Sequence, residues 1–367
     1  MAVRDIVVVG FSAGGIDPLL QLVGALPADF PGAVFVVHHF PPQSVSALPV
    51  ILKRTTSIAA AQAVDGEAIV PGRIYVARPN HHLLLEGLRV RLTHGPREQG
   101  HRPAIDPLFR SAARAFGPRV AGVILSGTLD DGTAGLLEVK ARGGLALVQE
   151  PEEAAYPGMV LSAIRNVLVD HVAPARELGL ILDRLAREDA PASGPGAGEP
   201  AFEDAGTGVG PDPAVRGTAS LQNREELGRP ASLACPDCGG MLFESERGGF
   251  LHFRCHVGHA YSEDALFAGQ SEALEQALWT AVRVLEEKAE LSRRLSERSG
   301  RRGLPAAAAR FDMSAREAER GSGLIRRSLL QGPVRETLEA GADDQIEPQV
   351  EAEGPAVEAM SPGRDAG

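Results

Sequence analysis

The sequence predicts an α/β fold built on a doubly wound, mostly parallel sheet. In the first half of the 367 residues, short β-branched apolar runs alternate with segments of helical periodicity. Several of these runs end directly in Gly, Ser, His or Asp, which is typical of the edge of an open parallel sheet where sites form. We therefore expect residues 1–186 to form one such domain, with catalytic side chains at the carboxyl ends of its strands.

The strands and helices follow from local signals. Strands are expected at residues 6–9, 33–38, 120–125 and 145–148. Helix starts are predicted at Asp17-Pro18 and Asp106-Pro107, because the acid can cap a helix and proline suits its first position. Residues 59–94 carry repeated turn signals between strand-like pieces, so an antiparallel insertion is expected there.

The first strand runs into Gly10-Phe11-Ser12-Ala13-Gly14, a G-x-S-x-G turn. The glycine spacing fits neither a dinucleotide fingerprint nor a P-loop, which needs a lysine after its last glycine. For a single motif of this kind, a small turn residue is the simplest role of the serine. A nucleophile is the alternative, because the glycines allow a tight turn that exposes the hydroxyl beside the positive end of the next helix.

Two other strand ends supply the partners that a nucleophilic serine needs. The second strand ends in His38-His39, and the strand at 120–125 leads to Asp130-Asp131. A histidine can accept the serine proton, and a carboxylate can fix the tautomer of that histidine. Adjacent strand residues point to opposite faces, so only one of the two histidines is expected at the site. The chain order Ser, His, Asp disfavours the α/β-hydrolase fold.

Five ordered blocks make residues 5–185 resemble the catalytic domain of the CheB-type protein-glutamate methylesterases. The blocks are VGFSAGG, VVHHFPP, GHRPAIDPLF, LSGTLDDGTAGL and PGMVLSAI. The resemblance implies a triad of Ser12, His39 and Asp131, which needs no cofactor for catalysis. It also implies hydrolysis of glutamyl γ-methyl esters, and in some members deamidation of glutamine, on the cytoplasmic helices of methyl-accepting chemotaxis proteins.

The resemblance extends to the surroundings of the triad. It places His101 and Arg102 near the substrate cleft, and backbone N–H groups near Ala13 and in the loop of Thr128 are the candidate oxyanion donors. For Arg102, a structural ion pair is the alternative to contact with an acidic receptor helix. Response-regulator members carry an N-terminal receiver domain, whereas the first strand here begins five residues from Met1, so a stand-alone form is expected.

Composition divides the rest of the chain. Residues 187–230 are rich in Gly, Pro and Ala, which predicts a flexible linker, and residues 331–367 are expected to form a disordered acidic tail. A small Cys/His module is predicted at 231–262 and a helical hairpin with an unknown partner at 263–330. The linker would let the C-terminal part act as a tether to a receptor array or a partner helix.

The hairpin is predicted from two apolar stripes at helical spacing. The first stripe consists of Leu274, Leu278, Ala281, Leu285 and Leu295, and the second of Ala308, Phe311, Ala315, Ala318, Ile325 and Leu329. Packing of one stripe against the other would bury both.

All three cysteines lie in the predicted module. Cys235 and Cys238 form a Cys-x-x-Cys pair, and Cys255 follows with His256 and His259. This spacing predicts a closed, structural Cys3His zinc site with His259 as the fourth ligand and His256 as the alternative. Three free cysteines are a weaker interpretation, because so short a segment with few apolar residues would hardly fold unaided.

Composition also narrows the function classes. The net charge is −11, without the basic surface of a nucleic-acid-binding protein, and no apolar run approaches the roughly 18 residues of a membrane span. The few cysteines fit a reducing compartment, so a cytoplasmic protein is expected. The prediction is a methylesterase in a chemotaxis or related chemosensory pathway. The alternatives are a serine esterase or amidase with another substrate, or a catalytically inactive adaptor.

Overall fold

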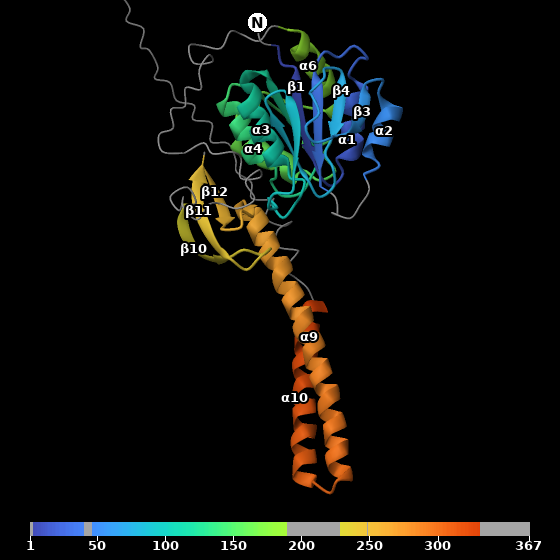
Figure 1. The fold of residues 1–367 in the computed structure, drawn as a ribbon, viewed down its shortest axis with the longest axis vertical. Coiled ribbons are helices and arrows are strands. Elements are labelled where there is room, and N and C mark those ends of the chain that lie inside the picture. The colour runs from blue at the N-terminus through green and yellow to red at the C-terminus, as the bar shows by residue number, and fades with distance from the viewer. Residues whose placement is uncertain (1–2, 40–45, 189–227, 248, 331–367) are drawn as a thin grey trace, which may run out of the picture. The chain divides into compact units, whose positions relative to one another are not determined.

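A computed structural model describes residues 3–39, 46–188, 228–247 and 249–330. The chain divides into two compact units, Met1–Ala273 and Leu274–Gly367. The first unit holds a seven-stranded sheet with its helices and a separate four-stranded sheet (Figure 1). None of the helices in the described ranges combines the length and the apolarity needed to cross a membrane.

The seven-stranded sheet is parallel and has the order β3-β4-β2-β1-β7-β8-β9. Its strands are β1 (Ile6–Phe11), β2 (Ala33–His38), β3 (Ala59–Gln62), β4 (Arg73–Val76), β7 (Val120–Ile124), β8 (Leu145–Gln149) and β9 (His171–Ala173). The flanking helices are α1 (Ile16–Gly24), α2 (Leu48–Thr55), α3 (Ile105–Phe116), α4 (Thr133–Ala141), α5 (Gly158–Asn166) and α6 (Ala175–Arg187).

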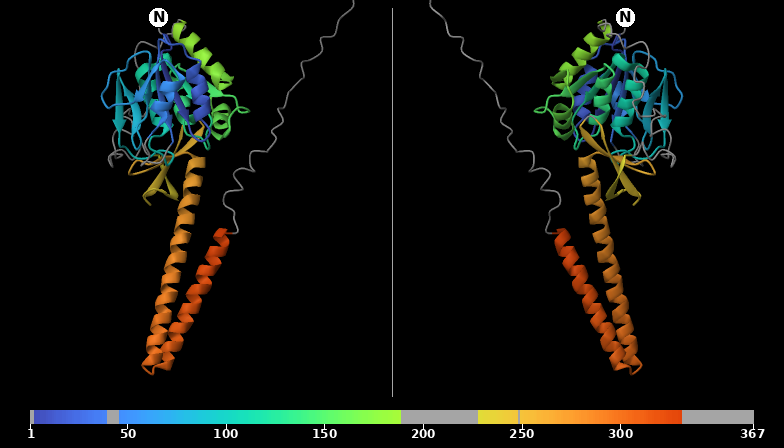
Figure 2. Two further views of the ribbon diagram at one scale, coloured as in Figure 1. Left: turned by 90° about the vertical axis from the view of Figure 1, so that its right-hand side faces the viewer. Right: turned by 90° about the vertical axis from the view of Figure 1, so that its left-hand side faces the viewer.

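Helices cover both faces of this sheet (Figure 2). Along β1, Val7 and Val9 pack into a core shared with α1, α2 and α6. Ile6 and Val8 pack into a second core with α3, α4 and α5. Alternate side chains of β1 therefore pack into two cores, one on each face of the sheet. This confirms the predicted doubly wound class.

Residues 59–94 are only partly the predicted antiparallel insertion. β5 (His82–Glu86) and β6 (Arg89–Thr93) do pair antiparallel, as a two-stranded sheet. β3 and β4 instead join the main sheet in parallel, because β4 pairs with β2 from much earlier in the chain. Turn signals locate strand ends, but they do not identify the strand that each one pairs with.

Both predicted helix starts were two residues too late. α1 begins after Gly15 and α3 after Ala104, so Asp17 and Asp106 lie in the first turns rather than at the caps. In α3 the first free N–H groups bond to the carboxylate of Asp131 from a distant loop, so no local cap is required.

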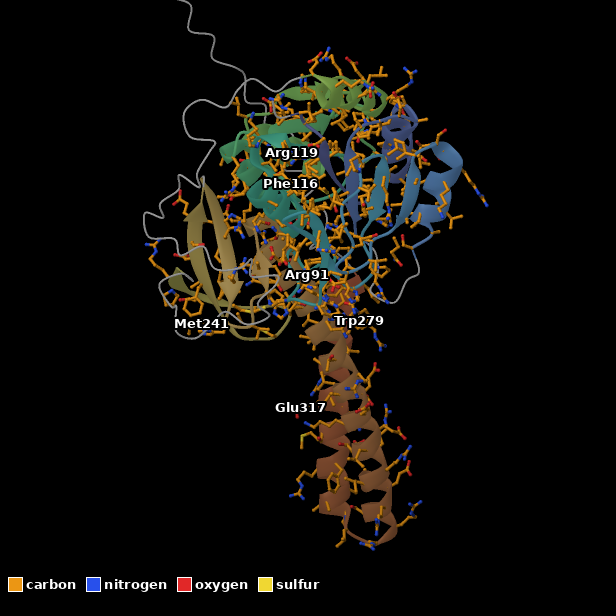
Figure 3. All side chains as sticks on the ribbon, turned by 45° about the horizontal axis from the view of Figure 1, so that its top comes forward. Arg91, Phe116, Arg119, Met241, Trp279 and Glu317 are labelled. Carbon is orange, nitrogen blue, oxygen red and sulfur yellow. The ribbon has the colours of Figure 1, made fainter. Side chains whose placement is uncertain are left out.

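The turn that leads into β7 is fixed by Arg119. Its guanidinium lies 5.3 Å from the ring centre of Phe116 (Figure 3). It also donates to both carboxylate oxygens of Asp5, at 2.8 and 2.7 Å. Because Asp5 immediately precedes β1, this contact ties the starts of two neighbouring central strands together.

The four-stranded antiparallel sheet begins two residues before the predicted Cys/His module, at the end of the predicted linker, and otherwise lies within the module. Its strands are β10 (Arg229–Ala234), β11 (Met241–Arg247), β12 (Phe250–Cys255) and β13 (Ala260–Tyr261). Leu242, Phe253 and Tyr261 are buried with Leu266 in a small core. Most of the predicted linker, residues 189–227, and the predicted tail, 331–367, lie outside the described residues.

Two long helices follow the module. They are α9 (Glu263–Arg301) and α10 (Pro305–Leu330), which run antiparallel (Figure 2). Arg293 pairs with Glu319, and Arg326 pairs with Glu286. Figure 3 shows the side chains of Trp279 on α9 and Glu317 on α10.

The two predicted apolar stripes differ in how well their residues are buried. In α10, Ala315 and Ala318 are buried as expected. In α9, Leu274 is 54% exposed, so its place on a buried stripe was wrong. The ion pair between Arg326 and Glu286 gives the physical reason, because the described part of α10 ends before it can reach the level of Leu274.

Candidate active site

Three side chains from separate turns meet at the carboxyl edge of the main sheet. Ser12 follows β1, His39 follows β2 and Asp131 follows β7, and these strands are neighbours in the order β2-β1-β7. His39 Nδ1 lies 3.1 Å from Ser12 Oγ, and His39 Nε2 lies 2.7 Å from Asp131 Oδ2. The strand order reverses at β1, which is where open α/β sheets form their sites.

The Ser12 turn is held by hydrogen bonds to its backbone. The Ser12 N–H donates to the carbonyl of Ser126 at 2.9 Å, and the hydroxyl of Ser126 donates to the carbonyl of Ala13 at 2.8 Å. The neighbouring Gly127 has no room for a side chain, since a Cβ there would lie 2.1 Å from Met159 Sδ and 2.9 Å from Ser12 Cβ. The serine is therefore fixed by its surroundings, and its hydroxyl is directed at the imidazole.

The carboxylate of Asp131 lies at the N-terminus of α3. It accepts the N–H groups of Ile105, at 2.8 Å, and of Asp106, at 3.1 Å. In return, the carboxylate of Asp106 accepts the N–H groups of Gly132, at 3.1 Å, and Gly135, at 2.7 Å, at the start of α4. The start of α3 thus binds the acid that precedes α4, and the start of α4 binds an acid of α3. These bonds satisfy free N–H donors at both helix starts.

The hydrogen bonds also determine which nitrogen of His39 faces Ser12 without a proton. The carboxylate of Asp131 accepts the Nε2–H of His39, so the Nδ1 atom carries the lone pair that faces Ser12. The imidazole is thereby oriented to take the serine proton. This is the arrangement of a serine nucleophile with its base and orienting acid.

The residues of the predicted His-Arg-Pro block differ in their roles. His101 stacks on His39 with the ring centres 3.7 Å apart and the planes 11° apart. Arg102 donates to the Asn80 side chain, at 2.8 and 3.0 Å, and to the carbonyl of Gly95 at 2.7 Å. His101 therefore belongs to the site, whereas Arg102 organises the adjoining loops through polar contacts that are not an ion pair.

The neighbours of the triad residues have other partners. His38 stacks on Phe11, with the ring centres 5.1 Å apart. Asp130 accepts a hydrogen bond from the hydroxyl of Ser262 at 2.7 Å. Thr128 is exposed in the loop after β7, where the sequence places an oxyanion donor.

Several residues that build the site were not predicted from the sequence. Ser126, Asp106 and Met159 shape the Ser12 turn or the Asp131 loop, yet none was predicted to do so. Each lies within one of the five blocks, and that position is the signal that could have drawn attention to them.

A second cluster lies in the Cys/His module. The ligand atoms of Cys235, Cys238, Cys255 and His259 all lie within 4.8 Å of one another. Cys238 Sγ and Cys255 Sγ are 3.7 Å apart, and each of Cys235 Sγ and Cys255 Sγ is 3.6 Å from His259 Nδ1. Tetrahedral zinc with bonds of about 2.3 Å to sulfur separates its ligands by about 3.7 Å, so this donor set could hold a metal ion. His256 instead packs edge-on against Phe243, at 4.8 Å.

Comparisons with known proteins agree on one family. A family model described as CheB methylesterase matches residues 7–182. Protein-glutamate methylesterase/protein-glutamine glutaminase 5 of Anaeromyxobacter dehalogenans is 41% identical over 186 residues, which make up 50% of this chain and 51% of that protein. A Leptospira interrogans protein named for the same two activities is 36% identical over 182 residues, 49% of this chain and 94% of that protein.

The solved structures include a similar protein. The crystal structure of the Thermotoga maritima CheB methylesterase catalytic domain is 33% identical, covers 49% of this chain and 98% of its own, and has a TM-score of 0.48. The chain spans about half the length of the first curated relatives that it matches.

Proposed function

This chain belongs to the CheB methylesterase family, and we propose that it hydrolyses glutamyl γ-methyl esters on the cytoplasmic helices of methyl-accepting chemotaxis proteins. The reaction would take place in the cytoplasm, within a chemotaxis or related chemosensory pathway. The observation that carries the proposal is the hydrogen-bonded chain of Ser12, His39 and Asp131 at the sheet edge.

The proposed reaction has two steps. Ser12 Oγ attacks the ester carbonyl while His39 Nδ1 takes its proton, and Asp131 stabilises the resulting imidazolium. The Ala13 N–H and the loop of Thr128 are proposed to bind the oxyanion. Collapse of the tetrahedral intermediate returns the proton to the methoxide, so methanol leaves. Water then attacks the acyl-enzyme with the imidazole again acting as base, which releases glutamate and restores the serine hydroxyl.

The same groups could act on a glutamine side chain. Ammonia would then leave in place of methanol, and the acyl-enzyme would be identical. The names of the relatives pair methylesterase with glutaminase activity, which favours testing this second reaction. His101, stacked on the base, is the residue that we place beside the substrate.

The test of the proposal is release of methanol from a purified receptor fragment that carries glutamyl γ-methyl esters. A fragment with free glutamates at the same positions is the matched blank. Methanol release from a simple ester but not from the receptor fragment would show an esterase with another substrate. No release from either would contradict the proposed chemistry.

The activity should fall on the acidic side of neutrality. Burial raises the pKa of Asp131 to about 6 and lowers the pKa of His39, so the pair gains a proton as the pH falls through about 6. A proton on either group removes the base that Ser12 needs, so the deprotonated pair is the active form. We expect kcat/KM to be level above about pH 7 and to fall about tenfold per pH unit below about 6.

The measurement is the pH profile of kcat/KM, with circular dichroism at each pH to show that the chain stays folded. A profile that stays level down to about pH 4 would mean that the pair is not the base.

We further propose that Cys235, Cys238, Cys255 and His259 bind one structural zinc ion. Four protein ligands leave no open position, so the metal would stabilise the small module and would not activate water. The module has a small core, which fits a need for a metal.

Purified protein should contain about one zinc per chain, and a strong chelator should unfold the β10–β13 sheet. The readouts are metal analysis and the reactivity of the three thiols, of which Cys235 and Cys255 are buried before chelation. His256→Ala is the control, since it should retain the metal, whereas His259→Ala should lose it. Metal content near zero in freshly purified protein would end the proposal.

A further inference from the structure

A tight turn at residues 98–101 borders the active site and ends in His101. The N–H of His101 donates to the carbonyl of Glu98 at 2.8 Å, and the N–H of Glu98 donates back at 3.2 Å. Gln99 and Gly100 both have positive φ, at 52° and 74°. Only the second is glycine, so the turn is held in an uncommon conformation. It places the His101 ring on the imidazole of His39.

The Cys/His module binds this turn. The N–H of Gln99 donates to the carbonyl of Ala260 at 2.8 Å, and the N–H of Ala260 donates to the carbonyl of Arg97 at 3.2 Å. The N–H of Ser262 donates to the side-chain oxygen of Gln99 at 2.8 Å. The start of β13 thus pairs with the turn that carries His101, through a parallel bridge between Glu98 and Ala260.

Ser262 also reaches the acidic loop of the triad. Its hydroxyl donates to Asp130 Oδ1 at 2.7 Å, and both residues are buried, with exposures of 3% and 5%. Asp130 is joined by one peptide bond to Asp131. The Gln99 amide donates at 3.3 Å to Asp106, whose other oxygen binds the start of α4. Two chains of bonds therefore lead from Ser262 to the triad carboxylate.

The hydroxyl of Ser262 matters because Asp130 is a buried acid. Burial raises the pKa of Asp130 to about 7, and the hydrogen bond from Ser262 opposes that rise. Without this donor, the carboxylate must either take up a proton or move toward water. Movement of Asp130 would displace the adjacent Asp131.

We propose that Ser262 is a positioning residue for the pair of His39 and Asp131, so that the C-terminal Cys/His module completes the active site. The inference rests on the proposed esterase function. Ser262 lies outside residues 7–182, which the family model matches. The module is therefore more than the tether that composition predicted.

The variants must separate this role from helix capping, because Ser262 Oγ also accepts the N–H of Ala265 at the start of α9, at 3.1 Å. Ser262→Ala loses both contacts. Ser262→Gly has no hydroxyl to donate, but glycine is tolerated at a helix N-cap and adds no charge beside Asp130. Ser262→Thr keeps both. Ser271→Ala, which removes a hydroxyl bonded only to the Phe267 carbonyl among the contacts described for α9, is the matched control.

Three measurements on the full chain test the proposal. They are kcat and KM for the ester, the rate at which a small fluorophosphonate modifies Ser12, and amide hydrogen exchange at residues 98–101 and 130–133. We expect Ser262→Ala and Ser262→Gly to lower kcat and the modification rate about tenfold or more, with KM changed less than about twofold. Exchange in both segments should rise about tenfold. Ser262→Thr and Ser271→Ala should stay within about twofold of the unmodified chain.

Two results would overturn the proposal. Ser262→Gly that reacts like the unmodified chain would show that Ser262 acts only as a helix cap. Unchanged exchange in Ser262→Ala would show that the module does not hold the two loops. If the proposed substrate is wrong, the pattern is different. The fluorophosphonate then still modifies Ser12, and the Ser262 variants still lower the modification rate, but no methanol is released from the receptor fragment.

Discussion

Replacement of Ser12 by alanine is expected to lower kcat for ester hydrolysis by about 10⁴-fold or more, while the chain stays folded. The oxygen of the serine hydroxyl is the atom that is proposed to form the acyl-enzyme. Its loss removes one side-chain hydrogen bond, to His39, whereas the backbone bond from Ser12 to Ser126 is kept. The measurement is methanol release in a single assay with the thermal midpoint of unfolding recorded alongside.

His39→Ala should cause a similar loss, and the double variant should be little worse than either single variant. Residues that act in one step are not additive, because removal of either one already abolishes the step. Ser57→Ala, at an exposed serine before β3, is the matched control and should leave kcat within about twofold. Near-normal hydrolysis by Ser12→Ala would exclude Ser12 as the nucleophile.

Asp131→Asn is expected to lower kcat by about 10⁴-fold. Asp131 Oδ2 accepts the Nε2–H of His39 and the N–H of Ile105, while Oδ1 accepts the N–H of Asp106. An asparagine has one oxygen for these three donors. If its amide faces the imidazole, the proton is forced onto Nδ1, which then cannot accept the proton of Ser12.

Asp130→Asn is the matched control for that variant, because it makes the same change one residue earlier. The amide oxygen can still accept the hydroxyl of Ser262, so we expect kcat to fall by no more than about fivefold. Both variants are compared by kcat and by thermal unfolding. A severe loss in Asp130→Asn with a mild one in Asp131→Asn would show that the orienting acid is the other carboxylate.

Much of the fold followed from local sequence patterns. The apolar runs located β1, β2, β7 and β8, because a strand buried on both faces must be apolar at almost every position. The edge location of the site followed as well, since the carboxyl ends of parallel strands meet on one side of a sheet. The choice of His39 and Asp131 over their neighbours came from the family resemblance, and the structure places both within hydrogen-bond distance of their predicted partners.

Local patterns gave wrong results where a distant group replaced a local one. Asp106 has the sequence of a helix cap, but its carboxylate binds the N–H groups of Gly132 and Gly135. The start of α3 is satisfied instead by Asp131. A free N–H at a helix start can bind any acceptor that the fold brings close to it. The acceptor therefore need not be the acid that lies next to it in the sequence.

The sequence by itself determined the chemistry available to this protein, namely a serine, a histidine and an acid at strand ends and a Cys3His set at metal-ligand spacing. Only the tertiary structure decided how the two parts of the first unit meet. Ser262 and Asp130 lie 132 positions apart, and their hydrogen bond depends on both being buried together. Contacts between segments so far apart in the sequence depend on the packing of the whole unit. Neither segment has a local sequence pattern from which the other could be predicted.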